Sequence, residues 1–205
     1  MKNEPIPSVT ALMSAGRLPL DVMKEINRLA EEFSLEVYLT NAQNIRLMGI
    51  PEGQVDTVQR CLTDLGVQLK GPGKFPLPRV CIGTGHCKLG IIDTWALSEK
   101  ITSKFMDREK TKAKFKIAVS GCILCCSNAK TTDLGIVATR EGLEFYVGGK
   151  GGPYPRIGRR IGKKLNDDEV LEMMSLLVDF HDAKTEKKQR FTKLIDLEDF
   201  PFPEV

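Results

Sequence analysis

Four of the six cysteines form two short-spaced pairs that suggest a metal or cluster site. The pairs read Cys81-x5-Cys87 and Cys122-x3-Cys126. Four thiolates carry four negative charges, so they converge only where a metal compensates them, and a [4Fe-4S] cluster takes four such ligands. Zinc is the rival, but structural zinc sites usually space their ligands by about two to four residues. The wider gap of the first pair therefore favours a cluster.

The residues around these cysteines are small, which suits a backbone that wraps closely around an anionic centre. Gly83, Thr84 and Gly85 lie inside the first pair, and Gly121 precedes the second. Glycine lets the main chain approach such a centre and direct N–H groups toward it. Disulfides are the alternative, but nothing in the sequence suggests secretion, and intracellular thiols stay reduced.

Two further cysteines fall outside the pairs. Cys61 lies in an amphipathic stretch, residues 55–62, and is most simply a small buried hydrophobic residue. Cys125 directly precedes Cys126 and is interpreted either as another buried side chain or as a spare ligand.

The composition is that of a globular protein with one domain or two small ones. Of the 205 residues, 41% are hydrophobic and 28% are charged. Lys and Arg number 30 against 27 for Asp and Glu, so the net charge of +3 does not indicate a nucleic-acid partner. The start of the sequence has no signal-peptide pattern, and no apolar run is long enough to span a membrane. We therefore expect a cytoplasmic protein with no nucleic-acid or membrane partner.

The elements that position the cysteines divide at a segment rich in Pro and Gly, residues 70–78. Hydrophobic periodicity before this segment predicts a small helix-on-sheet unit over residues 1–70. Its expected elements are helices over 19–33 and 52–65 and strands over 35–39 and 44–50.

After the first cysteine pair, the patterns predict a helix over 89–105 that buries Trp95. A strand over 112–120 alternates with period two and leads into the second pair, and a hairpin joins 133–139 to 143–147. A capping-box signal at Asn166 starts a helix that runs to about His181. The remaining expectations are a basic surface loop around 156–164 and another helix over 186–195. The fold class is therefore α+β.

Taken together, these residues resemble the siroheme and [4Fe-4S] nitrite/sulfite reductase hemoprotein family, in a small single-repeat form like the low-molecular-weight assimilatory-type sulfite reductases. The motif that carries the resemblance is Cys81-Ile-Gly-Thr-Gly-His-Cys87 with Lys114-Phe-Lys-Ile-Ala-Val-Ser-Gly-Cys122-Ile-Leu-Cys-Cys126, supported by Thr40-Asn-Ala-Gln43 and Tyr146-Val-Gly-Gly-Lys150. The resemblance implies a ferredoxin-like half repeat, an α/β sandwich, over residues 1–70. It also implies an α/β domain over 75–200 that binds siroheme and the cluster and ends in a helical tail.

The resemblance implies roles for the cysteines and for two lysines. Cys81, Cys87, Cys122 and Cys126 would hold the cluster, with Cys126 also bridging to the siroheme iron. Lys114 and Lys116 would stabilise the anion and supply protons. The alternation of the strand independently places Lys112, Lys114 and Lys116 on one face, although an ordinary solvated face is the alternative.

Siroheme carries eight carboxylates in the family chemistry, and charge-assisted bonds to arginine are the strong ones. The cofactor contacts that we expect are Arg79, Thr84, Asn128, Lys150, Arg156, Arg159 and Arg160. A basic surface loop explains the last three arginines equally simply.

Two departures from the family pattern concern the substrate and the cluster. The family's substrate arginine is Ala42 here, and we predict that Arg46 replaces its charge as a third catalytic residue. Ile123-Leu124-Cys125 replaces the usual Pro-Asn pair after the first cysteine of the second pair.

The resemblance implies six-electron reduction of sulfite to sulfide, with reduction of nitrite to ammonia as the alternative. Electrons would come from an external donor such as a ferredoxin, and a second copy of the chain could cover the open site as a homodimer. The competing classes are a cluster-bearing electron-transfer or binding protein without reductase activity, and a structural zinc module.

Overall fold

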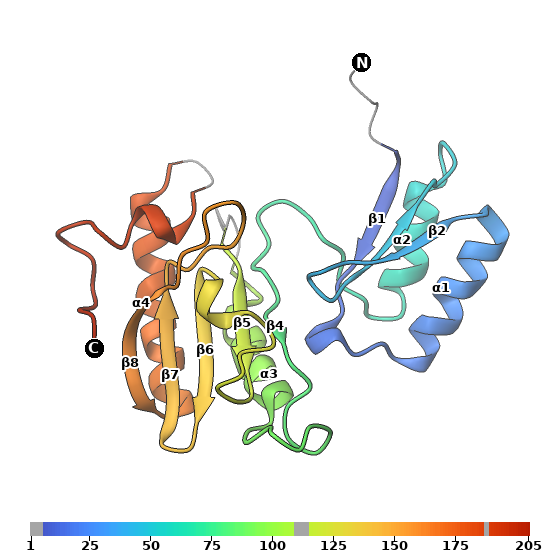
Figure 1. Ribbon diagram of the computed structural model, residues 1–205. Coiled ribbons are helices and arrows are strands. Elements are labelled where there is room, and N and C mark those ends of the chain that lie inside the picture. Colours follow the sequence, from blue (N-terminus) through green and yellow to red (C-terminus); the bar gives the residue numbers. More distant parts are fainter. Residues whose placement is uncertain (1–5, 109–114, 187–188) are drawn as a thin grey trace. The chain divides into compact units, whose positions relative to one another are not determined.

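The structure is a computed structural model that describes residues 6–108, 115–186 and 189–205 (Figure 1). It divides into two units, Met1–Pro72 and Gly73–Val205, and each unit has a hydrophobic core of its own. The first unit covers the residues expected to form the half repeat, and the second carries both cysteine pairs.

Unit 1 is a three-stranded antiparallel sheet with two helices. Its strands are β1 (Ser8–Ala11), β2 (Glu36–Leu39) and β3 (Ile45–Met48) in the order β1-β3-β2, and its helices are α1 (Leu20–Phe33) and α2 (Val55–Thr63), with a 3-10 turn η1 (Ser14–Gly16). Apolar residues at helical spacing, Val22, Ile26 and Leu29, form the buried side of α1. Cys61 on α2 packs half-buried against this core, as the sequence predicted.

Unit 2 is built on a mixed five-stranded sheet in the order β4-β5-β6-β7-β8. The strands are β4 (Arg79–Val80), β5 (Ile117–Ser120), β6 (Leu134–Thr139), β7 (Gly142–Val147) and β8 (Arg159–Leu165). β4, β5 and β6 run parallel, and the remaining pairs are antiparallel. The expected hairpin is β6–β7, in which Thr139 pairs with Gly142 across a two-residue turn.

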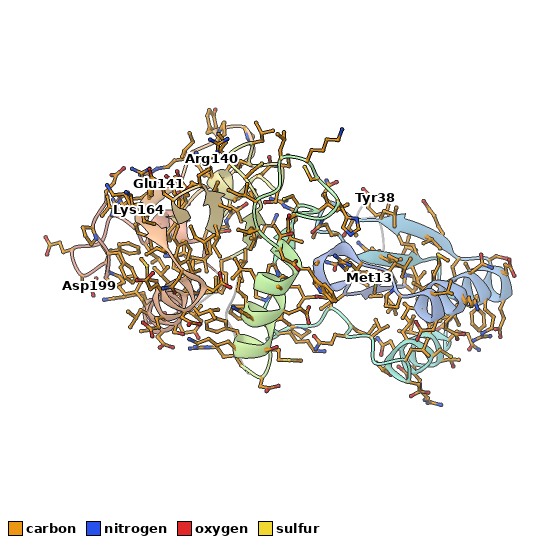
Figure 2. The ribbon with its side chains drawn as sticks, turned by 90° about the horizontal axis from the view of Figure 1, so that it is seen from below. Met13, Tyr38, Arg140, Glu141, Lys164 and Asp199 are labelled. Carbon is orange, nitrogen blue, oxygen red and sulfur yellow. The ribbon has the colours of Figure 1, made fainter. Side chains whose placement is uncertain are left out.

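Two helices, α3 (Thr94–Phe105) and α4 (Asp167–Lys184), lie on the same side of this sheet, as Figure 2 shows. They contact each other through Lys100, whose Nζ lies 2.7 Å from an oxygen of Asp167, and through Lys104, which donates to the Leu171 carbonyl. α4 begins with the capping box that the sequence predicted at Asn166. Among the described residues, no helix is long and apolar enough to cross a membrane.

The opposite face of the sheet is covered by the chain that follows β5. A 3-10 turn, η2 (Ala129–Thr131), lies directly on β6, and small residues make room for it. A Cβ built on Gly135 would come within 2.0 Å of the Ala129 carbonyl oxygen. β5 is consequently buried on both faces.

Four expectations from the sequence were wrong. The helix expected over 89–105 begins only at Thr94, because residues 83–92 form a hydrogen-bonded loop, and Trp95 is 42% exposed. The helix expected over 186–195 is a 3-10 turn, η3 (Phe191–Lys193), within the residues that are described. The expected basic loop forms the edge strand β8, whose cationic side chains remain at the surface while Ile161 is buried.

Candidate metal centre

The two cysteine loops leave the carboxyl ends of two neighbouring parallel strands. Val80 of β4 pairs with Val119 of β5, Cys81 follows β4 at once, and Gly121 follows β5 at once. Parallel strands bring such ends to the same edge of a sheet, where α/β proteins place their ligand sites. The topology therefore brings both cysteine pairs to one edge.

Hydrogen bonds join the two loops directly. The Gly121 N–H donates to Cys81 Sγ at 3.0 Å, and the Ile91 N–H donates to the Gly121 carbonyl at 2.9 Å. The loops also fold tightly within themselves, because a Cβ on Gly90 would come within 2.5 Å of the Gly83 carbonyl carbon. This close packing fixes the main chain around the thiols before any metal contributes.

The donor set fits a four-thiolate cluster in its chemistry. All four predicted ligands are free thiols, with Cys81, Cys87 and Cys122 half-buried and Cys126 exposed. Within the described ranges, no three His, Cys, Asp or Glu side chains lie close enough to hold one metal ion. Four thiolates are the ligand set of a [4Fe-4S] cluster.

Cys125 differs in its surroundings from its neighbour Cys126. Its main chain is left-handed, with φ 57°, and its side chain packs on the sheet against a small cluster. That cluster consists of Ala118, Ala129, Val137 and Tyr146. The Lys130 N–H donates to Cys125 Sγ at 3.4 Å. Of the two readings from the sequence, the structure supports the packed side chain.

Lys116 lies immediately before β5 and has an exposed side chain, between the buried residues Phe115 and Ile117. The predicted alternation therefore holds at this end of the strand. Lys112 and Lys114 lie outside the described residues. β5 separates Lys116 from Cys122, and at about 3.3 Å per residue only a ligand as large as a macrocycle would reach both.

The side chain of Arg79 on β4 forms hydrogen bonds to the second cysteine loop and to Thr132, which follows it. Its Nε donates to the Ser127 carbonyl at 2.8 Å, and a terminal nitrogen donates to Thr132 Oγ1 at 3.2 Å. Burial of this side chain lowers the pKa of the Arg79 guanidinium. Two other expected cofactor contacts, Thr84 and Asn128, are exposed in the cysteine loops, and Asn128 is left-handed with φ 57°.

The remaining expected cofactor cations are engaged by the chain itself. Arg156 and Arg159 both pair with Asp196, at 3.6 Å and 2.8 Å, and Arg160 pairs with Glu144 at 2.8 Å. The main chain of Lys150 pairs with that of Arg156 in an isolated antiparallel β-bridge. The three arginines thus already have protein carboxylates as partners, and their role toward a cofactor stays a prediction.

Arg46 is the one predicted site residue in unit 1. It lies on β3, where its Nε and a terminal nitrogen donate to Ser8 Oγ at 3.1 Å and 2.7 Å. Its role toward an anion also stays a prediction.

Sequence reasoning missed a buried carboxylate beside Lys116. Asp133 is fully buried and contacts both the Lys116 main chain and the Arg190 side chain, at 3.0 Å and 2.7 Å. Burial raises the pKa of Asp133, and Arg190 opposes that rise. The only signal in the sequence is an acidic residue at the start of an apolar strand.

A mixed-sheet unit that presents four thiols at one edge has the ligand types of a [4Fe-4S] protein. Residues 77–197 match the nitrite and sulphite reductase 4Fe-4S domain, and residues 6–65 match the nitrite/sulfite reductase ferredoxin-like half domain. The chain therefore belongs to the nitrite and sulfite reductase family. This confirms the expected family, fold class, oxidoreductase class and cofactor pair, siroheme and [4Fe-4S].

The similar proteins differ greatly in length, so that this chain spans most of one and less than a fifth of another. It is 26% identical over 183 residues to the assimilatory-type sulfite reductase of Nitratidesulfovibrio vulgaris, covering 88% of this chain and 83% of that protein. It is 27% identical over 191 residues to the nitrite reductase [NAD(P)H] of Emericella nidulans, covering 92% of this chain but only 17% of that protein.

Two solved structures share the fold. The NirA protein of Mycobacterium tuberculosis matches with a TM-score of 0.74 at 18% identity, covering 94% of this chain and 38% of that chain. Dissimilatory sulfite reductase I matches with a TM-score of 0.76 at 12% identity, covering 92% of this chain and 66% of that chain.

Proposed function

We propose that this protein is a sulfite reductase that catalyses the six-electron reduction of sulfite to sulfide at a siroheme coupled to a [4Fe-4S] cluster. The observation that carries the proposal is the pair of cysteine loops at the ends of β4 and β5, hydrogen-bonded through Gly121 and Cys81. The match to the assimilatory-type sulfite reductase of N. vulgaris, which covers 83% of that protein, supports sulfite as the substrate.

In this proposal Cys81, Cys87, Cys122 and Cys126 hold the cluster. When bound, siroheme and cluster supply electrons and an open coordination position for the anion. The exposed ammonium of Lys116, with Lys114 and Arg46, attracts the anion and stabilises its charge. The two lysines also deliver protons as the three oxygens of sulfite leave as water. The electrons come from an external one-electron donor such as a ferredoxin.

The test is the visible absorption spectrum of anaerobically purified protein, with iron and acid-labile sulfide measured on the same sample. We expect siroheme bands that shift on addition of sulfite, and sulfide formation with a reduced viologen dye as donor. A cluster spectrum without siroheme bands, after growth with adequate siroheme supply, would favour the electron-transfer class. A colourless protein with bound zinc would contradict the proposal.

Nitrite is the second candidate substrate, because several similar proteins are named nitrite reductases. Both anions need positive charge around them, so the lysines do not distinguish them. The comparison that decides is kcat/KM for sulfite and for nitrite on the same preparation, with sulfite expected to be higher. A higher value for nitrite would reverse the assignment.

A further inference from the structure

Asp133 is the most connected buried charge beside the proposed anion site. Its side chain is fully buried at the start of β6, and Oδ2 accepts the Lys116 N–H at 3.0 Å. The Lys116 carbonyl in turn accepts the Leu134 N–H at 3.0 Å. Both main-chain groups of Lys116 are therefore fixed by two consecutive residues, Asp133 and Leu134.

The second oxygen of Asp133 connects this point to the C-terminal part of the chain. Oδ1 accepts from Arg190 Nε at 2.7 Å, and the main chain of Phe191 also hydrogen-bonds to the carboxylate. A buried carboxylate without such partners is costly. Arg190 is therefore the cationic partner of the buried carboxylate that holds Lys116.

The same residues hold the loop between β7 and β8. The Gly148 N–H donates to the Asp133 carbonyl at 2.8 Å, and a terminal nitrogen of Arg190 donates to the Gly149 carbonyl at 3.3 Å. Lys150, an expected cofactor contact, follows directly. Asp133 and Arg190 thus contact the main chain at or beside two of the predicted site lysines, Lys116 and Lys150.

We propose that Asp133 is a positioning residue, which together with Arg190 fixes the main chain at Lys116 so that its ammonium group meets the anion. This inference rests on the proposed function, in which Lys116 binds sulfite. Asp133 itself is buried and acts through Lys116, whereas the exposed Lys116 side chain makes the contact.

The variants that test this role are Arg190→Gln, Asp133→Asn and the conservative Arg190→Lys. Arg108→Gln is the matched control, because Arg108 is 31% exposed in its side chain against 30% for Arg190 and also pairs with aspartate, here Asp179 and Asp182 of α4. Lys116→Ala and the double variant Lys116→Ala/Arg190→Gln complete a double-mutant cycle.

We expect Arg190→Gln and Asp133→Asn to raise the KM for sulfite about tenfold, the loss typical of a misplaced charge-assisted contact, with a smaller change in kcat. Lys116→Ala should raise KM at least as much, and adding Arg190→Gln to it should change KM no further. Arg190→Lys should recover part of the affinity, and Arg108→Gln should leave it unchanged. Hydrogen exchange at the Lys116 amide should become faster in Asp133→Ala, which removes the accepting oxygen.

Additive effects in the double variant would overturn the positioning role while leaving the proposed function intact. Unchanged exchange at the Lys116 amide in Asp133→Ala would also overturn it. If the wild-type protein reduces no sulfite, the proposed function fails, and the exchange measurement still decides whether Asp133 holds Lys116. Should Asp133→Asn not fold, Arg190→Lys and Arg190→Gln provide the same comparison.

Discussion

At the scale of single residues, Gly135 decides whether the second cysteine loop can lie on the sheet. A side chain there would collide with the Ala129 carbonyl at 2.0 Å. We expect Gly135→Ala to lower the free energy of unfolding by about 1–3 kcal/mol and to reduce the iron content. Gly151→Ala is the control, because nothing lies within 4 Å of its Cβ position. Thermal denaturation and iron analysis provide the measurement, and equal behaviour of the two variants would contradict the prediction.

Cys125 gives a second prediction at this scale. Because its side chain packs on the sheet with Ala118 and Tyr146, Cys125→Ala should keep iron and acid-labile sulfide at the wild-type level. Cys122→Ala should lose most of both. The measurement is the iron and sulfide content per chain after anaerobic purification. Loss of the cluster in Cys125→Ala would instead identify this residue as a ligand.

The cysteine pairs could be predicted from the sequence because each pair is local in the chain. Asp133 and Arg190 could not, since 57 positions separate them and neither belongs to a recognisable motif. The pairing of Arg159 with Asp196, 37 positions away, was hidden for the same reason. Spacing therefore identifies ligands, whereas the charges that support them depend on the fold.

At the scale of elements, the start of α3 fixes the first cysteine loop. Thr94, the first residue of the helix, donates to the Cys81 carbonyl at 2.6 Å. Asp93 caps the helix by accepting the N–H groups of Trp95 and Ala96 at 2.9 Å and 3.1 Å. Asp93→Ala should therefore cost about 1 kcal/mol of stability, measured as a lower thermal midpoint. Asp93→Asn keeps the capping oxygen and should stay close to wild type. An equal loss of stability in both variants would show that the capping hydrogen bonds are not the cause of the loss.

Elements with a clear apolar period were predicted well, and elements with other determinants were not. α1 and the β6–β7 hairpin follow their hydrophobic patterns. β8 was missed because cations occupy most of its positions and only pairing with β7 makes it a strand. The late start of α3 reflects close main-chain contact between Gly83 and Gly90, which no helical periodicity reveals.

At the scale of the whole molecule, the segment of chain that joins the two units should be accessible to trypsin. The division falls at Pro72 and Gly73, and both Lys70 and Lys74 are exposed. Phe75 already belongs to unit 2, where its ring stacks on Phe105 at 5.0 Å between centroids. Brief trypsin treatment of the holoprotein should therefore cut first within residues 70–74, because the flanking chain is held by packed cores.

The products of that cut test where the cofactor is held. All four predicted ligands lie in unit 2, so the larger fragment should keep the iron and acid-labile sulfide of the intact protein after separation. A Lys70→Gln/Lys74→Gln variant should resist the cleavage and serves as the control. Release of iron on cutting would show that unit 1 also holds the cofactor, because the cysteine loops of unit 2 would then not suffice for it.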